Sequence, residues 1–264
     1  MDPITQNVFY ESKVRGCNPG FVVTGEGVVM IDAPVDVEVG KKWKQEIEKH
    51  GRIRLLINTE HHMDHWVSDG VFPVDILSHE STREVMMTMD REFIMARSKI
   101  LYKDPYTLPP GYQLKRPNLT YAGRMILYFG SHTFHIIHTP GHTPGVSAVY
   151  IPEEKIVFTG DNVVGKTRTA YHDADPVKWV ESLKMLEQLD VKYVLPGHGV
   201  PVGKEHLAVQ SQIVQGWREG MEGAKAGGKA FDDDAKRKVD PYFDSRDTGI
   251  NPSVVLTATA RRNQ

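Results

Sequence analysis

Short apolar runs and longer amphipathic stretches alternate along the first third of the chain. Runs typical of β-strands occupy residues 21–24, 27–32, 53–58 and 74–78. Between the second and third runs, residues 37–50 show helical spacing; Asp36 is a suitable helix cap before them, and Gly51 is a stop signal after them. The order strand, helix, strand, strand predicts an α/β layered fold.

The second half of the chain repeats this pattern. Two strand pairs are predicted, residues 124–129 with 132–138 and residues 146–151 with 155–159. Helical patterns follow over residues 175–189 and 205–224, with a predicted strand at residues 191–195 between them. Because each half gives strands followed by a helix, we expect two stacked sheets flanked by helices.

Residues 80–115 form a predicted helical insert within a domain of residues 1–226. Residues 80–104 read as one long helical pattern rich in methionine, and Met87 is one of its members. Methionine suits an adaptable apolar wall, so the stripe is either core or part of a substrate pocket. The proline-rich stretch 104–112 cannot be helical and would place Tyr106 over the site.

Composition changes after residue 226. A Gly-Gly pair and a charged stretch precede an apolar run at residues 254–257. We expect residues 227–264 to be a C-terminal extension, with residues 240–260 packing on the domain or on a neighbouring subunit of a homodimer.

Charge and cysteine content narrow the function classes. With 32 basic and 34 acidic residues the formal net charge is -2, which gives no electrostatic basis for a nucleic-acid or membrane partner. Cys17 is the sole cysteine, which excludes an internal disulfide and a cysteine-based metal cluster. No apolar run approaches the roughly 20 residues that span a membrane. The N-terminal residues lack a signal-peptide pattern, so we expect a cytoplasmic protein acting on a small molecule.

Residues 59–66 concentrate the candidate chemistry. They follow the predicted strand at 53–58 and hold three histidines and two carboxylates. Three later segments also carry histidine or aspartate directly after an apolar strand: His142 within residues 139–145, Asp161 after Thr-Gly, and His198 within Pro-Gly-His-Gly. Rigid strands that present imidazole and carboxylate groups from adjacent loops are typical of a divalent metal site.

In this order, the four segments resemble those of the metallo-β-lactamase-fold hydrolase superfamily, in particular its glyoxalase-II-like or lactonase-like branch. The resemblance covers about residues 7–215. It implies a four-layer αβ/βα sandwich, an α/β fold with a two-metal site at the edge between the halves. It also implies the ligands: His62 and His142 for the first metal, Asp64, His65 and His198 for the second, and Asp161 bridging both.

Glu60 is the main departure from the family pattern, which has histidine at this position. Three alternatives follow: Glu60 ligates a working two-metal site, it swings away and the second site alone is filled, or the site is degenerate. His61 is offset by one residue and should point elsewhere. Zinc is expected, and the carboxylate of Glu60 would favour manganese or iron more than imidazole does.

The resemblance implies a hydrolase in which a metal-bound hydroxide attacks an ester, lactone or thioester of a small apolar or aromatic substrate. Asp64 would orient the hydroxide and pass a proton to the leaving group, and Asp32 is a candidate acceptor for a ligand imidazole. The candidates for substrate contact are Trp66, Met87, Tyr106, Lys166, Arg168, Tyr171 and His172. The alternatives are a metal-binding protein without turnover and an iron-dependent redox enzyme on the same fold.

Overall fold

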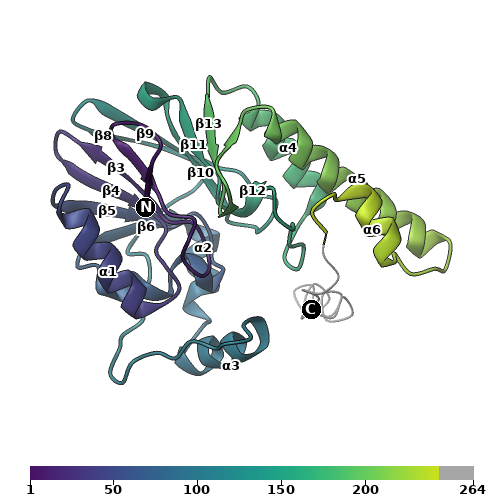
Figure 1. Ribbon diagram of the computed structural model, residues 1–264, viewed down its shortest axis with the longest axis horizontal. Helices are drawn as coiled ribbons and strands as arrows, with labels where there is room; N and C mark the ends of the chain where they lie inside the picture. The colour runs from purple at the N-terminus through teal and green to yellow at the C-terminus, as the bar shows by residue number, and fades with distance from the viewer. Residues whose placement is uncertain (244–264) are drawn as a thin grey trace.

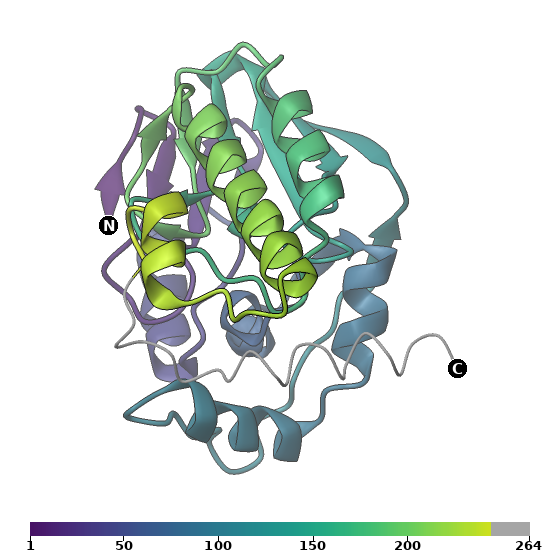
Figure 2. The ribbon, with the colours of Figure 1, turned by 90° about the vertical axis from the view of Figure 1, so that its right-hand side faces the viewer.

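The computed structural model describes residues 1–243, whose elements lie in four layers, helix, sheet, sheet and helix (Figure 1). Helix α1 (Val37–Glu48) covers the outer face of the first sheet. Helices α4 (Pro176–Leu186) and α5 (His206–Ala226) cover the outer face of the second sheet, where they lie side by side (Figure 2). The predicted four-layer α/β sandwich is confirmed.

The first sheet has its strands in sequence order. They are β1 (Asp2–Pro3), β2 (Val8–Tyr10), β3 (Gly20–Thr24), β4 (Gly27–Ile31), β5 (Ile53–Ile57), β6 (Asp75–His79) and β7 (Leu119–Tyr121). The first four are antiparallel, whereas β4 to β7 are parallel. Short 3-10 turns, η1 (Met63–His65) and η2 (Val67–Val71), connect β5 to β6.

The second sheet has the order β15-β13-β11-β10-β9-β8. Its strands are β8 (Arg124–Phe129), β9 (His132–His138), β10 (Ser147–Ile151), β11 (Ile156–Phe158), β13 (Tyr193–Leu195) and β15 (Val202–Gly203). A separate pair joins β12 (Val164–Gly165) to β14 (His198–Gly199). The turns η3 (Pro152–Glu154) and η4 (Gly160–Asn162) flank β11.

Strand β4 shows why the central strands read as continuous apolar runs. Val29 and Ile31 belong to the cluster between the sheets, whereas Val28 and Met30 pack with Trp43 of α1. Both faces of the strand are therefore buried, and an apolar residue is needed at every position. Burying each such large side chain contributes about 1.5–3 kcal/mol.

The helical insert differs from the prediction of one long helix. It contains two helices, α2 (Glu80–Met87) and α3 (Arg91–Leu101). The side chain of Asp90 accepts a hydrogen bond from the Phe93 N–H (2.7 Å), which starts the second helix. The methionine pattern continues through this break, so apolar spacing alone could not reveal it.

Beyond α5, helix α6 (Asp233–Val239) packs back on α5. Phe231 and Phe243 flank the Trp217 ring, at centroid distances of 5.2 and 6.0 Å. Asp240 is fully buried beside them. The rest of the extension expected to pack, residues 244–260, lies outside the described residues.

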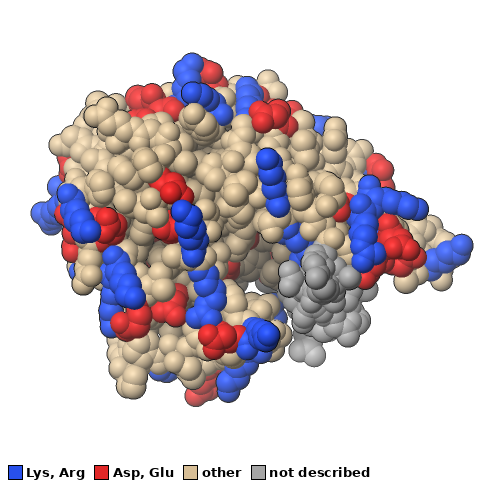
Figure 3. All heavy atoms as spheres, viewed as in Figure 1, with Lys and Arg blue, Asp and Glu red and all other residues tan. Residues whose placement is uncertain are grey.

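Two surface properties bear on function. On the face drawn in Figure 3, basic and acidic side chains are interspersed, in keeping with the net charge of -2. None of the helices within residues 1–243 combines the length and apolar character that crossing a bilayer requires.

Candidate metal centre

Four loops bring the candidate ligands to one edge of the sandwich. In the second sheet, β9 and β11 are both antiparallel to β10, and β11 is parallel to β13, so these three strands end at the same edge. The loops that follow them carry His142, Asp161 and His198. The loop after β5 adds Glu60 and its neighbours from the first sheet, so the ligands meet where the two sheets face each other.

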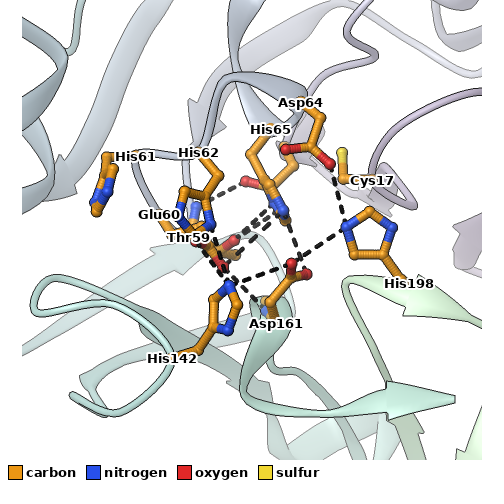
Figure 4. A network of polar contacts seen from close by, with 12 residues as sticks. Cys17, Thr59, Glu60, His61, His62, Asp64, His65, His142, Asp161 and His198 are labelled. Carbon is orange, nitrogen blue, oxygen red and sulfur yellow. Dashed lines mark hydrogen bonds and ion pairs between the residues drawn. The ribbon is translucent and has the colours of Figure 1, made fainter. Parts of the chain in front are cut away.

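The first donor group contains Glu60, His62, His142 and Asp161 (Figure 4). His62 Nδ1 lies 2.7 Å from Glu60 Oε2 and 3.1 Å from His142 Nε2. His142 Nε2 lies 3.5 Å from Asp161 Oδ2 and 3.7 Å from Glu60 Oε2. The Glu60 carboxylate therefore points into this group, which favours the alternative in which Glu60 is a ligand.

The second donor group contains Asp64, His65 and His198, with Asp161 between the two groups. His198 Nε2 lies 3.1 Å from Asp64 Oδ2 and 3.2 Å from Asp161 Oδ2. His65 Nε2 lies 3.3 Å from Asp161 Oδ1. Asp161 thus reaches both groups, which is the position of a bridging carboxylate.

The donor set fits a pair of divalent ions. Ligand atoms held about 2.0–2.2 Å from one tetrahedral ion lie roughly 3.3–3.6 Å apart, close to the spacing in both groups. Glu60 Oε2, His65 Nε2 and Asp161 Oδ1 are buried and make no hydrogen bond within residues 1–243. Their nearest charged neighbours are other donor atoms of the two groups, and bound cations would satisfy all three.

The electrostatics of the first group favour positive charge beside Glu60. Burial acts to raise the pKa of Glu60, but the imidazoles of His142 and His62 outweigh it and lower the pKa to about 2. Burial acts to lower the pKa of His62, whereas Glu60 and Asp173 raise it to about 10. A divalent cation would supply this charge without a proton.

The second group has the same character. Burial acts to lower the pKa of His198, yet the carboxylates of Asp161 and Asp64 raise it to about 10. Burial opposes ionisation of Asp161, but His198 and His65 hold its pKa well below the ordinary range. Asp64 remains ionised for the same reason, because its hydrogen bond with His198 lowers its pKa.

Asp32 supports the second group from the end of β4. Its Oδ2 lies 2.9 Å from His65 Nδ1, and its carboxylate accepts hydrogen bonds from the Thr59 N–H and hydroxyl, both at 2.7 Å. Asp32 adopts a left-handed backbone (φ 56°), which aspartate tolerates better than most residues. An aspartate carboxylate only accepts, so His65 carries its proton on Nδ1 and leaves Nε2 free for a metal.

His61 is turned away from the donor groups (Figure 4). It is buried, and its Nε2 lies 3.6 Å from Asp173 Oδ2. Asp173 also lies 3.1 Å from His62 Nε2. The sequence could not assign Asp173 to this site, because nothing in a polar loop before a helix indicates a contact 111 residues upstream.

Three of the residues predicted to contact substrate lie in or beside the insert. Trp66 is fully buried, and its indole N–H donates to the His61 carbonyl (2.8 Å), so it is a core residue and cannot touch a substrate. Tyr106 is buried in the same apolar cluster, with a hydroxyl that has no partner in the described chain. Met87 lies on α2 and is 54% exposed.

The other candidates lie in the loop after Asp161. The ring of His172 lies 4.5 Å from that of His62, so it borders the first donor group. Tyr171 instead stacks on Trp217, at 4.3 Å between ring centroids. Arg168 lies close enough to lower the pKa of the buried Asp240, a pKa that burial raises. Lys166 is exposed. His172 is thus the candidate that the structure places against a predicted ligand.

Comparison with solved structures agrees with this architecture. A metallo-beta-lactamase from Pontibacter korlensis superposes with a TM-score of 0.66 at 20% identity, over 81% of this chain and 97% of that chain. The sec-alkylsulfatase Pisa1 from Pseudomonas sp. gives a TM-score of 0.68 at 15% identity, over 85% of this chain and 43% of that chain. At these identities the likeness concerns the fold alone.

Similar sequences include a beta-lactamase-like protein 2 homolog of Caenorhabditis elegans, 24% identical over 214 residues, which are 77% of this chain and 66% of that protein. An atrochrysone carboxyl ACP thioesterase of Aspergillus fumigatus is 31% identical over 81 residues, 31% of this chain and 25% of that protein. A hydroxyacylglutathione hydrolase of Bartonella quintana is 36% identical over 73 residues, 27% of this chain and 29% of that protein. The chain thus spans less than two thirds of the length of each of these relatives.

The family model described as the metallo-beta-lactamase superfamily matches residues 12–198, which is more than half of the chain. This range contains all four ligand-bearing loops and strands β3 to β13. Because the matched residues carry most of both sheets and the complete donor set, the chain belongs to the metallo-β-lactamase superfamily.

Proposed function

We propose that this protein is a metal-dependent hydrolase that cleaves an ester, lactone or thioester bond of a small apolar or aromatic substrate. The observation that carries the proposal is the pair of donor groups that share Asp161 and converge with buried imidazole and carboxylate atoms. Membership of the superfamily supports hydrolysis as the general chemistry.

Two divalent ions fit the donor set. Glu60, His62 and His142 would hold the first, Asp64, His65 and His198 the second, and Asp161 both. When bound, such ions polarise a substrate carbonyl and lower the pKa of water from 15.7 toward about 7. Imidazole nitrogens suit zinc, whereas the additional carboxylate of Glu60 makes the first site harder and more favourable for manganese or iron.

Asp64 is the proposed proton carrier. Its side chain is 16% exposed, unlike the fully buried side chains of Glu60 and His65. It can therefore reach a substrate while His198 holds its Oδ2 at 3.1 Å. As an ionised carboxylate, Asp64 would accept the proton of the attacking water, which a bound metal makes more acidic, and pass it to the leaving group.

The names of two relatives favour the thioester class. One relative is a thioesterase and another is a hydroxyacylglutathione hydrolase. The matches cover about a third of this chain or less, so they support a substrate class and no individual substrate. Cytoplasmic location, lack of nucleic-acid and membrane partners, and a homodimer stay predictions from the sequence.

The test starts with metal analysis of the purified protein. The protein, a chelated sample and His142→Ala would then be assayed on an ester, lactone, thioester, amide and phosphodiester panel. We expect turnover of an acyl substrate that chelation abolishes, zinc or manganese restores, and His142→Ala lowers by at least about 100-fold, since this variant removes a ligand imidazole. Acyl hydrolysis that survives chelation would refute the proposal, as would no turnover of any acyl substrate by the metal-loaded protein.

One observation favours a second candidate, an iron-dependent redox enzyme. The carboxylate at Glu60 adds a hard ligand to the first donor group, which suits iron better than a third imidazole would. In that case the purified protein would contain iron and consume oxygen with an added reductant, while the acyl panel would stay negative.

A further inference from the structure

The segment 170–175 lies across the outer side of both imidazoles in the first donor group. The carbonyl oxygen of Ala170 is 3.1 Å from His142 Nδ1. Asp173 Oδ2 is 3.1 Å from His62 Nε2. The first contact uses Nδ1 of His142, and the second uses Nε2 of His62. The other nitrogen of each ring, His142 Nε2 and His62 Nδ1, faces its counterpart at 3.1 Å beside Glu60.

These contacts determine where the protons of the two rings lie. A carbonyl and a carboxylate oxygen can only accept, so Nδ1 of His142 and Nε2 of His62 must donate. When a metal ion takes the place of the second proton, the other nitrogen of each ring offers its lone pair. Both free lone pairs therefore point toward the same position, next to Glu60 Oε2.

The segment is fixed to a rigid helix. Asp175 caps α4 by accepting from the Val177 and Lys178 N–H groups at 3.1 Å, and its own N–H donates to the Gly141 carbonyl (2.8 Å). The indole N–H of Trp179, in the first turn of α4, donates to the Asn162 carbonyl (2.9 Å). The Asp173 carboxylate is thus held on the same scaffold as the loop that carries His142.

The two histidines that are not ligands surround Asp173. His61 Nε2 lies 3.6 Å and His172 Nε2 3.9 Å from its Oδ2. The His172 ring also lies against that of His62, at 4.5 Å. His61 and His172 therefore flank the carboxylate, whose side chain is 32% exposed.

We propose that Asp173 is a positioning residue that fixes the ring orientation and tautomer of His62 and so sets the metal affinity of the first site. The proposal rests on the metal-centre assignment made above, but its test measures metal binding and needs no substrate. Carboxylates that accept from a ligand imidazole hold its orientation and raise its basicity, and their loss typically costs 10–100-fold in metal affinity. In this chain the effect should be confined to the first site, because Asp32 serves the second through His65.

The experiment compares Asp173→Ala and Asp173→Asn with Asp175→Ala, a control that loosens the helix cap of the same segment and leaves the carboxylate at His62. Zinc affinity of each site would be measured by chelator competition, with the visible spectrum of the cobalt-substituted protein as a second readout. We expect Asp173→Ala to weaken one site about 10–100-fold and change its cobalt spectrum. Asp173→Asn should recover part of the affinity, because its amide oxygen still accepts from Nε2. Asp175→Ala should lower the melting temperature with little effect on affinity.

The Glu60→Ala background assigns the effect to a site. If Asp173 acts through His62, adding Asp173→Ala to Glu60→Ala should leave the affinity of the remaining second site unchanged. Equal weakening of both sites in Asp173→Ala, or wild-type affinity at both, would overturn the proposal. A fully bound metal pair without turnover would contradict the proposed hydrolase and leave this inference standing.

Discussion

Glu60 gives the first donor group a carboxylate in addition to that of Asp161. Its two oxygens have separate roles: Oε1 accepts from the Asp161 N–H (3.1 Å), and Oε2 faces His62 Nδ1 (2.7 Å). The carboxylate is fully buried, so its orientation is fixed by these neighbours. A carboxylate here brings one more negative charge than the imidazole of the family pattern, which makes the site a weaker Lewis acid and a harder one.

Replacement of Glu60 should therefore change metal content. We expect Glu60→Ala to lower the bound metal from two ions toward one per chain, because the first group would keep two imidazoles and a shared carboxylate. Glu60→His should restore the second ion and raise the preference for zinc over manganese. Elemental analysis after dialysis against equal zinc and manganese would measure both effects.

Glu84 offers a matched control, since it is an exposed glutamate on α2. Glu84→Ala should bind metal as the unchanged protein does. Two tightly bound ions in Glu60→Ala would show that Glu60 is no ligand.

At the residue scale, histidine and aspartate directly after apolar strands indicated a metal site, and the family resemblance implied the individual ligands. Asp173 and the Ala170 carbonyl could not be found in this way. Their contacts to His62 and His142 span 111 and 28 residues and depend on how α4 docks. Trp66 was misassigned to the pocket, because its place directly after His65 does not reveal that its side chain turns into the core.

The loop that carries His142 packs directly against α4. Gly141 lies so close to the helix that a Cβ there would meet Trp179 Cα at 2.7 Å and Asn162 Oδ1 at 2.8 Å. Contacts this short require the backbone to move, and here the moving loop carries His142. Glycine is therefore required at position 141, because the backbones of the loop and of α4 approach too closely to leave room for a Cβ.

Gly141→Ala should separate the loop from α4. We expect a loss of about 1–3 kcal/mol in the free energy of unfolding, as for other overpacked sites, together with weaker metal binding at the first site. Urea unfolding of the metal-free protein and zinc titration would measure the two effects.

Gly223→Ala is the matched control, because a Cβ at this exposed position of α5 would meet nothing within 4 Å. This change should stabilise the protein by up to about 1 kcal/mol, since alanine is the better helix former. Equal stability of the two variants would contradict the close-approach argument.

At the scale of elements, apolar periodicity predicted the long helices and the central strands, whose burial on both faces makes them continuous apolar runs. It missed β1, β2, β7 and β15, which have two or three residues each and too few positions to show a period. The pair β12–β14 was missed because each strand has two residues and lies in a loop, and the sequence does not show that these loops pair. The break between α2 and α3 depends on the cap at Asp90, within a stretch that had suggested continuous helix.

For the whole molecule, the candidate metal centre concentrates ionisable groups inside a protein of nearly balanced charge. His62 and His198 each have their pKa raised to about 10, against an ordinary value of about 6.5. Above about pH 6.5 the unfolded chain releases these protons while the folded chain keeps them. The folded state then binds more protons, so stability must fall as the pH rises.

The metal-free protein should accordingly lose stability between about pH 6.5 and 10, by at most about 1.4 kcal/mol per pH unit for each retained proton. Burial, together with the charges of His62 and His142, lowers the pKa of His172 to about 3. Below about pH 6.5 the unfolded chain therefore binds a proton that the folded chain does not, and stability falls as the pH falls. Stability should therefore peak near neutral pH.

Bound metal should remove the alkaline loss, since ions at the two donor groups displace the protons of His62 and His198 in the folded state. Thermal melts of chelated and zinc-loaded samples at half-unit intervals from pH 6 to about 9.5 would compare the two forms. We expect the melting temperature of the chelated protein to fall across this range and that of the loaded protein to change less, so that the gap widens with pH. Parallel curves would mean that these two histidines do not hold protons in the metal-free fold, and the assignment of their free nitrogens to metal would lose its electrostatic support.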